Sequence, residues 1–196
     1  SENIGPTNNM NVGISLSRGE WVHVLHDDDS VYPGFYSSLQ QNLQNCPENI
    51  GAACTGFEYV DEKGKTVRLG EISSSSGQQK GILQNWLSRI GVCGLVMTPA
   101  LVIRRKTHER LGGYSCEIPN INDWELHKRI ATFYDWWYEP EVLARFRVHS
   151  HSETSGSWNS GEMAVQVGKA IEISHSYLPV GSRAEITAKA RISNFK

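Results

Sequence analysis

The chain has 196 residues and a formal net charge of −2, with 21 acidic and 19 basic side chains. This length can bury one good hydrophobic core, and the charge balance argues against a general nucleic-acid binder, which would be strongly basic. The sequence contains no run of about 18 apolar residues that would predict a membrane span, and its polar N-terminus does not resemble a signal peptide. The cysteines form no Cys-x-x-Cys pair and are expected to be reduced thiols of a cytoplasmic protein: Cys46, Cys54, Cys93 and Cys116.

Apolar spacing and turn residues in the first half of the chain predict alternating helices and strands. Residues 21–25 form a short apolar run typical of a buried strand. A Pro-Gly pair at 33–34 is typical of a helix start, and apolar side chains then recur at every fourth position as far as Leu43. The predicted elements are a helix at 12–16, a strand at 21–25, a helix between 34 and 46, strands at 51–60 and 66–69 around a turn at 61–65, and a mobile loop at 73–80.

The second half of the chain is predicted to contain more helix. Thr107 is expected to cap one helix, and Ser182, at the start of a capping box, another. A strand at 142–149 would gather basic side chains on one face, because successive side chains of a strand alternate. The predicted elements are a helix at 82–90, a strand at 101–103, a helix ending at 112–113, a helix starting at 123 with Leu126, Ile130 and Phe133 on one face, strands at 136–138 and 142–149, and helices at 162–178 and from 182 onward.

Three carboxylates directly follow the predicted strand at 21–25, in the segment His26-Asp27-Asp28-Asp29. Adjacent negative charges repel one another and resist the loss of water unless a positive group compensates them. A divalent metal with oxygen ligands, Mg²⁺ or Mn²⁺, that carries a phosphorylated substrate is the simplest such group. The alternative is an acidic surface turn before the next helix, since Asp and Ser favour such positions. The cluster alone is compatible with both.

Five segments of the chain follow one another in a characteristic order. They are Asn11-x-Gly13; residues 19–29 with Pro33-Gly34; Arg104-Arg105 with Leu111-Gly112-Gly113-Tyr114; Asp123-Trp124-Glu125-Leu126; and the strand at 142–149. Together they resemble segments of family-2 glycosyltransferases with the GT-A fold: the metal-binding segment, the family segments that follow it, and the strand that closes the catalytic domain. The resemblance covers residues 3–152. It implies an α/β fold in which helices flank a mixed sheet.

The resemblance also implies a domain division and a general activity. Residues 1–152 would form the GT-A domain and residues 153–196 a C-terminal helical extension. The first strands of the family, which bind the nucleotide base, have no counterpart here, so we expect an N-terminally truncated fold. Such enzymes move a sugar from a nucleotide-diphosphate donor to a hydroxyl acceptor, usually with inversion. A carbohydrate or lipid-linked acceptor in polysaccharide or glycoconjugate synthesis is therefore expected.

Within the acidic segment, the resemblance assigns roles to individual residues. Asp28 is the implied metal ligand, with Mn²⁺ or Mg²⁺ as the cofactor. Asp27 would approach the ribose or the diphosphate of the donor. His26 stands where the family often has Asp, and Asp29 is a further candidate ligand. The register among these four residues stays open.

Basic and amide side chains complete the implied donor site. In the resembling enzymes a histidine near the position of His149 reaches the metal or the diphosphate, whereas the alternative is a structural histidine. Arg147 would contact the diphosphate or pair with surface acids, and Asn11 is expected among the substrate-binding residues. His151 is a weaker candidate than His149.

Asp123 aligns with the aspartate of the family's Glu-Asp pair, which is the general base that takes the proton of the acceptor hydroxyl. Asn122 stands where the glutamate is usual, which is a departure from the pattern. The alternative for Asp123 is a plain helix N-cap. Glu125 is the second candidate carboxylate, and Trp124 would form an apolar wall under a sugar ring or belong to the core.

The sequence is less typical of two other classes of function. A non-catalytic nucleotide- or sugar-binding module is suggested by Asn122 and by the missing strands. A metallohydrolase is disfavoured, because the histidines show no HExxH motif or comparable ligand spacing. We expect a cytoplasmic protein with no nucleic-acid partner. Peripheral contact with the inner face of the membrane and assembly into homo-oligomers are compatible with the sequence but not required by it.

Overall fold

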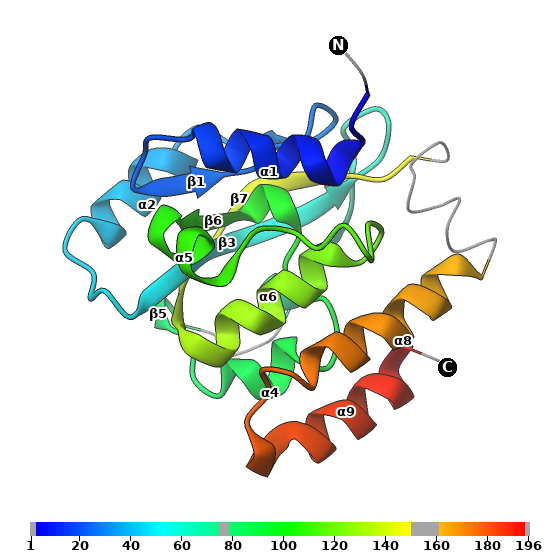
Figure 1. Cartoon of the computed structure of the whole chain (residues 1–196). Helices are drawn as coiled ribbons and strands as arrows, with labels where there is room; N and C mark the ends of the chain where they lie inside the picture. The colour runs from blue at the N-terminus through cyan, green and yellow to red at the C-terminus, as the bar shows by residue number, and fades with distance from the viewer. Residues whose placement is uncertain (1–2, 75–78, 150–160, 195–196) are drawn as a thin grey trace.

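A computed structural model of the chain describes residues 3–74, 79–149 and 161–194, and Figure 1 shows a twisted sheet through the middle of the molecule with helices around it. The strands are β1 (Trp21–His23), β2 (Ser30–Val31), β3 (Ile50–Val60), β4 (Thr66–Leu69), β5 (Gly81–Ile82), β6 (Leu101–Arg104) and β7 (Asp135–Arg147). The helices are α1 (Pro6–Leu16), α2 (Phe35–Leu43), α3 (Glu71–Ser74), α4 (Trp86–Ile90), the 3₁₀ turn η1 (Thr98–Ala100), α5 (Arg105–Leu111), α6 (Asn122–Phe133), α8 (Glu162–Ser174) and α9 (Val180–Asn194).

The sheet is mixed, as predicted from the sequence. Five of its seven strands follow the order β1-β6-β3-β7-β2, while β4 pairs with β3 and β5 pairs with β7. β3 and β7 are parallel, and the other described pairs are antiparallel. β1 therefore lies at one edge of the described sheet, with β6 on its inner side.

Small residues in β3 allow its neighbours to approach closely. All 11 residues of the strand are buried. Gly51 packs against Tyr134, and a Cβ added to the glycine would lie 2.5 Å from that side chain. Gly56 faces the backbone of Pro140, and a Cβ there would lie 2.7 Å from the proline carbonyl oxygen. The β3–β7 register shifts at this point, because Pro140 has no N–H to donate to the ladder. The two strands predicted at 136–138 and 142–149 are thus one irregular strand.

Two groups of buried apolar side chains hold the layers together. The larger group lies between the sheet and the inner helices, and it includes the predicted apolar face of α2: Phe35, Leu39 and Leu43. Figure 1 shows α8 and α9 side by side below α6. The second group joins α8 and α9 to α6 and the loop before it: Ile118, Trp124, Met163, Val167, Ala170, Ile171 and Ala190. The helix predicted at 162–178 thus packs, through α8, against α6.

Several predicted boundaries and caps are wrong. The segment predicted as a helix at 82–90 begins with the end of β5, and its helical part is α4 alone. Asn85 separates the two with a left-handed φ of 52°, which Asn tolerates better than most residues. Thr107 and Ser182 lie within α5 and α9, so neither is the N-cap. Phe133 is the last residue of α6 and is 54% exposed, so it does not share the buried face of the helix.

Among the remaining expectations, some element boundaries are wrong and the state of the cysteines is confirmed. α1 begins at Pro6, well before the predicted start, because proline is suited to the first turn of a helix. Ser73 and Ser74 belong to α3 rather than to a loop, whereas residues 75–78 of the predicted loop lie outside the described residues. All four cysteines are free thiols, as expected. Within the described ranges, no helix combines the length and the apolar character needed to cross a membrane.

Two histidines are buried without polar partners. Neither ring nitrogen of His108 in α5 or of His127 in α6 has a hydrogen-bond partner in the described part of the chain. His127 packs edge-on against Trp136, with ring centroids 5.6 Å apart. Burial lowers the pKa of each histidine to about 4, because the charged ring would lose its hydration.

We predict that these buried rings make the fold sensitive to acid. An unfolded histidine binds a proton near pH 6.5, whereas His127 in the native state does so only near pH 4. The unfolded state therefore binds more protons in this window, and the free energy of unfolding falls as the pH is lowered through it. Replacing the residue, His127→Leu, should reduce the loss between pH 7 and pH 5 by about 2 kcal/mol. Urea unfolding at both pH values measures this, and an unchanged pH dependence would contradict the prediction.

Candidate active site

The acidic turn, residues 26–29, connects β1 to β2 at the rim of the sheet. His26, Asp28 and Asp29 each offer one ligand atom, and these atoms all lie within 4.8 Å of one another. Within the turn, Nδ1 of His26 lies 3.9 Å from Oδ2 of Asp29. Asp27 is exposed and does not belong to this group. The structure thus brings together the three residues of this turn that the sequence offered as metal ligands.

Asp29 has an unusual environment for a carboxylate. Its side chain is 1% exposed, and Oδ2 is buried without a hydrogen-bond partner among the described residues, while Oδ1 accepts the N–H of Arg147 at 2.9 Å. Burial raises the pKa of Asp29 to about 6; the Arg147 N–H opposes this shift, and the charge of Asp28 adds to it. An unsatisfied buried oxygen costs free energy that a bound cation would recover. This oxygen-rich group therefore fits a divalent cation such as Mn²⁺ or Mg²⁺.

His149 reaches the acidic turn from the residues that follow β7. Its Nε2 lies 3.2 Å from Oδ2 of Asp28. At this distance the imidazole can orient the carboxylate or turn toward the same cation. The predicted neighbour of the metal is therefore in reach of the site, whereas His151 lies outside the described residues.

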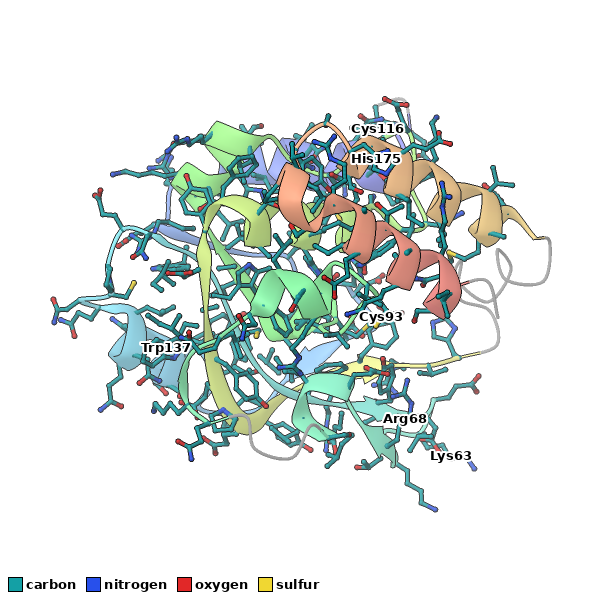
Figure 2. The ribbon with its side chains drawn as sticks, turned by 90° about the horizontal axis from the view of Figure 1, so that it is seen from below. Lys63, Arg68, Cys93, Cys116, Trp137 and His175 are labelled. Atoms are coloured by element: carbon teal, nitrogen blue, oxygen red, sulfur yellow. The ribbon has the colours of Figure 1, made fainter. Side chains whose placement is uncertain are left out.

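Arg147 supports the acidic turn through backbone contacts. Its Nε donates to the carbonyl of Asp28 at 2.9 Å, and its Nη1 donates to the carbonyls of Asp61 and Glu62 at 2.9 and 3.0 Å. These bonds join the acidic turn to the turn between β3 and β4, where Lys63 points outward in Figure 2. The described guanidinium contacts are thus to backbone carbonyls, and the diphosphate contact expected from the resemblance stays a prediction.

The start of α6 positions Asp123. The carboxylate is half-buried, and its Oδ1 accepts the backbone N–H of Trp124 at 2.6 Å. The buried side chain of Asn122 donates to Thr7 Oγ1 at 3.0 Å and so ties this turn to α1. β7 begins directly after α6 and runs back along it. The first turn of α6 and the last residues of β7 therefore lie toward the same end of the molecule, on the right of Figure 1.

Trp124 and Glu125 point into the protein. Trp124 is buried in the second apolar group, and its indole N–H donates to the carbonyl of Ile90 at 2.7 Å. The packing thus agrees with the alternative that Trp124 belongs to the core. Glu125 accepts two bonds from Arg129, at 3.1 and 2.8 Å, and that guanidinium also donates to the carbonyl of Gly113 at 2.8 Å. Sequence analysis missed Arg129, although its i, i+4 spacing from Glu125 is the signal that could have found it.

Asn11 holds the loop that leads from α5 toward α6. Its Nδ2 donates to the carbonyl of Tyr114 at 2.9 Å, and its Oδ1 accepts the N–H of the same residue at 2.8 Å. Gly113 permits this contact, because a Cβ there would lie 2.1 Å from Oδ1 of Asn11. The described contacts of Asn11 therefore support this loop, and the substrate contact expected from the resemblance stays a prediction.

A pocket of about 470 Å³ lies elsewhere in the described structure. It is lined by residues of α4, the end of α6 and the start of α9. Its carboxylate, Asp135, is already bonded to Nδ2 of Asn49 at 2.7 Å. Asp135 begins β7 whereas the acidic turn lies beside its end, so this cavity is separate from the candidate metal site. We place the chemistry at the acidic turn, because the unsatisfied carboxylate is there.

Comparison with known proteins identifies the family. The sequence model described as glycosyl transferase family 2 matches residues 1–108, which is more than half of the chain. The chain belongs to glycosyl transferase family 2. Its curated relatives include uncharacterized glycosyltransferases of Rickettsia felis, 27% identical over 162 residues, and of Rickettsia typhi, 24% identical over 166 residues. Each match covers 82% of this chain, which spans 26% and 50% of the length of those two proteins.

Solved structures resemble this family-2 chain in fold. S. aureus TarS (residues 1–349) in complex with UDP superimposes with a TM-score of 0.64 at 13% identity, covering 96% of this chain and 52% of that one. A second structure of the same TarS segment gives a TM-score of 0.66 at 12% identity, covering 98% of this chain and 53% of that one. The predicted GT-A fold and the predicted family are thus confirmed. Asp123, Arg147 and His149 come after the segment that the family model matches.

We predict that the substitution Asp29→Asn has opposite effects on the stability of this chain with and without metal. Asparagine keeps the oxygen that accepts the Arg147 N–H but removes a buried negative charge. The free energy of unfolding of the metal-free protein should therefore rise by about 1–2 kcal/mol. The increase in Tm produced by Mn²⁺ should disappear, because a cation ligand is lost. Thermal unfolding with and without Mn²⁺ measures both effects.

The substitution Asp135→Asn is the matched control, since it alters a carboxylate at the other end of β7. It should keep the increase in Tm caused by Mn²⁺. If Asp29→Asn also keeps that increase, Asp29 is not a metal ligand.

Proposed function

We propose that this chain carries the catalytic site of a metal-dependent, inverting glycosyltransferase that transfers a sugar from a nucleoside-diphosphate donor to a hydroxyl group. The observation that carries this proposal is the buried, unsatisfied Oδ2 of Asp29 beside His26 and Asp28. A carboxylate oxygen kept dry without a hydrogen-bond partner is costly, and a bound cation would offset that cost. Family membership and the TarS fold support the same conclusion.

The proposed cation site consists of His26, Asp28 and Asp29, with His149 beside it. A bound Mn²⁺ or Mg²⁺ would supply positive charge to the diphosphate as the leaving group forms. The protein's own part is to hold these side chains in place. The Arg147 side chain supports the backbone at Asp28. The backbone N–H of Arg147 binds one oxygen of Asp29, which leaves the other oxygen for the cation.

Asp123 is the proposed general base. Inversion requires a carboxylate that takes the acceptor proton on the side of the sugar opposite to the leaving group. Asp123 lies on the first turn of α6, where the helix dipole favours negative charge, and toward the same end of the molecule as the acidic turn. One of its oxygens is bonded to the N–H of Trp124, which leaves the other for an acceptor hydroxyl.

The substrates are proposed by class. TarS has been solved with UDP, and we propose a nucleoside-diphosphate sugar as the donor here, with a carbohydrate or lipid-linked acceptor. Asp27 is exposed beside the cation site and is the proposed contact to the donor. Because β1 is an edge strand, further strands that bind the nucleotide base would extend the sheet beside it. We also propose a cytoplasmic location, with contact to the inner face of the membrane and assembly into homo-oligomers as parts of the same proposal.

A non-catalytic binding module of the same fold is the second candidate. It is favoured by one observation: Asn122, which replaces the usual glutamate, is buried and committed to Thr7. Such a module would bind a nucleotide-sugar with Mn²⁺ and release no nucleoside diphosphate when an acceptor is present.

We predict that Asp123→Asn abolishes transfer while binding persists. Loss of the base should lower the turnover rate about 10²–10⁴-fold, whereas the Mn²⁺ and donor dissociation constants should change little. Release of nucleoside diphosphate from a panel of UDP- and GDP-sugars with simple sugar acceptors measures turnover, and calorimetry measures binding.

The matched control is Glu162→Gln, which alters a carboxylate on the first turn of α8 and should leave turnover unchanged. Turnover that persists in the Asp123 variant would remove this residue as the base. Metal-dependent donor binding by the unaltered chain without any turnover would favour the binding module.

A further inference from the structure

Glu58 is a buried carboxylate that no sequence motif singled out. It lies in β3, is 6% exposed, and both of its oxygens are bonded. Oε1 accepts the hydroxyl of Tyr32 at 2.6 Å and Nε of Arg145 at 3.0 Å, while Oε2 accepts the hydroxyl of Thr66 at 2.9 Å. We call this set the Glu58 network. Because a buried carboxylate needs such partners, each of these groups is held in one position.

The Glu58 network joins three strands next to the acidic turn. Glu58 in β3 and Ser30 in β2 both lie opposite Arg145 of β7. Tyr32 follows β2 directly, and its N–H donates to the carbonyl of Leu143 at 2.8 Å. β2 begins at the residue after Asp29. The network therefore fixes the downstream end of the acidic turn to the central strands.

The same face of β7 holds the turn from the side. Arg147 lies two residues after Arg145, so the side chains of both point the same way from the strand. The Arg145 guanidinium stacks over the ring of Tyr32, 4.2 Å from its centroid, and also donates to the Tyr32 hydroxyl. Arg147 donates to Asp28 and Asp29 as described above. Displacement of Arg145 would thus disturb β2 and the neighbouring strand segment that contacts the turn.

A second buried glutamate provides a comparison. Glu139, also in β7, is 5% exposed and accepts bonds from Lys80 at 2.9 Å, Asn42 at 3.0 Å and Ser38 at 3.2 Å. These partners come from α2 and from the segment before β5, and none of them adjoins the acidic turn in sequence. Glu58 and Glu139 are thus similar in burial and bonding. They differ in the segments that they bind, because only the partners of Glu58 lie next to the acidic turn.

We propose that Glu58, acting through Tyr32 and Arg145, is a positioning residue that sets the geometry of the acidic turn and thereby its affinity for a divalent cation. The effect of Glu58 on cation affinity rests on the proposed function, because it assumes the cation site at His26, Asp28 and Asp29. The effect of Glu58 on the geometry of the turn does not depend on any metal.

The test compares Glu58→Gln with Glu139→Gln in the whole chain. Without metal, amide hydrogen exchange in residues 26–33 should become about tenfold faster in the Glu58 variant and stay unchanged in the Glu139 variant. The dissociation constant for Mn²⁺ alone, measured by calorimetry, should rise about tenfold in the Glu58 variant only. Tyr32→Phe keeps the ring but removes the bridging hydroxyl, so it should show a smaller change in the same direction and serves if the Glu58 variant does not fold.

The outcomes separate the two proposals. Exchange in residues 26–33 that is unchanged in the Glu58 and Tyr32 variants, or that rises equally in the Glu139 variant, overturns the positioning role. Unaltered protein that fails to bind Mn²⁺ overturns the proposed metal site, and hydrogen exchange still decides whether Glu58 positions the turn. Faster exchange with an unchanged Mn²⁺ dissociation constant overturns the link between the two.

Discussion

The parallel pairing of β3 with β7 is the constraint on which the rest of the structure depends. β7 begins directly after α6 and ends beside the acidic turn, so a single strand relates the candidate base to the candidate metal site. β3 can lie at the centre because its residues are buried and many of them are small. Glycine at positions 51 and 56 lets Tyr134 and the backbone at Pro140 approach as closely as the pairing requires. Ladder pairing fixes the register, and the register decides which side chains meet the turn.

Polar groups in the interior fall into two kinds. Glu58, Glu125 and Glu139 have both oxygens in hydrogen bonds or a bidentate pair, so burial costs them little. Asp29 keeps one buried oxygen without a partner in the described chain. This cost is explained if the turn must bind a cation, since a functional site often retains groups that destabilise the free protein. The ring nitrogens of His127 are also unsatisfied, and nothing in the described structure explains them.

The family relationship and the site geometry draw on different parts of the chain. The family model matches residues 1–108, which include the acidic turn. The first turn of α6 and the end of β7, which bring Asp123, Arg147 and His149 to that end of the molecule, follow this segment. Their place in the site rests on tertiary structure, and the resemblance of the whole chain to TarS shows that the arrangement of these elements is that of the GT-A fold. The outer helices α8 and α9 then cover α6 through a separate apolar group.

The sequence by itself determined features that neighbouring residues encode. These are the apolar face of α2, the small-residue strand β3, the turn before β4 and the acidic cluster after β1. Periodicity and turn chemistry act over a few residues, so these predictions needed no partner. Tertiary structure decided the rest. Which backbone carbonyls Arg147 would reach, that Trp124 would be buried in the core, and that Glu58 would be bonded to Tyr32 and Arg145 all depend on contacts between residues far apart in the chain. The bond from the Arg147 N–H to Asp29 spans 118 positions, and no local pattern encodes a pairing that exists only after the sheet has formed.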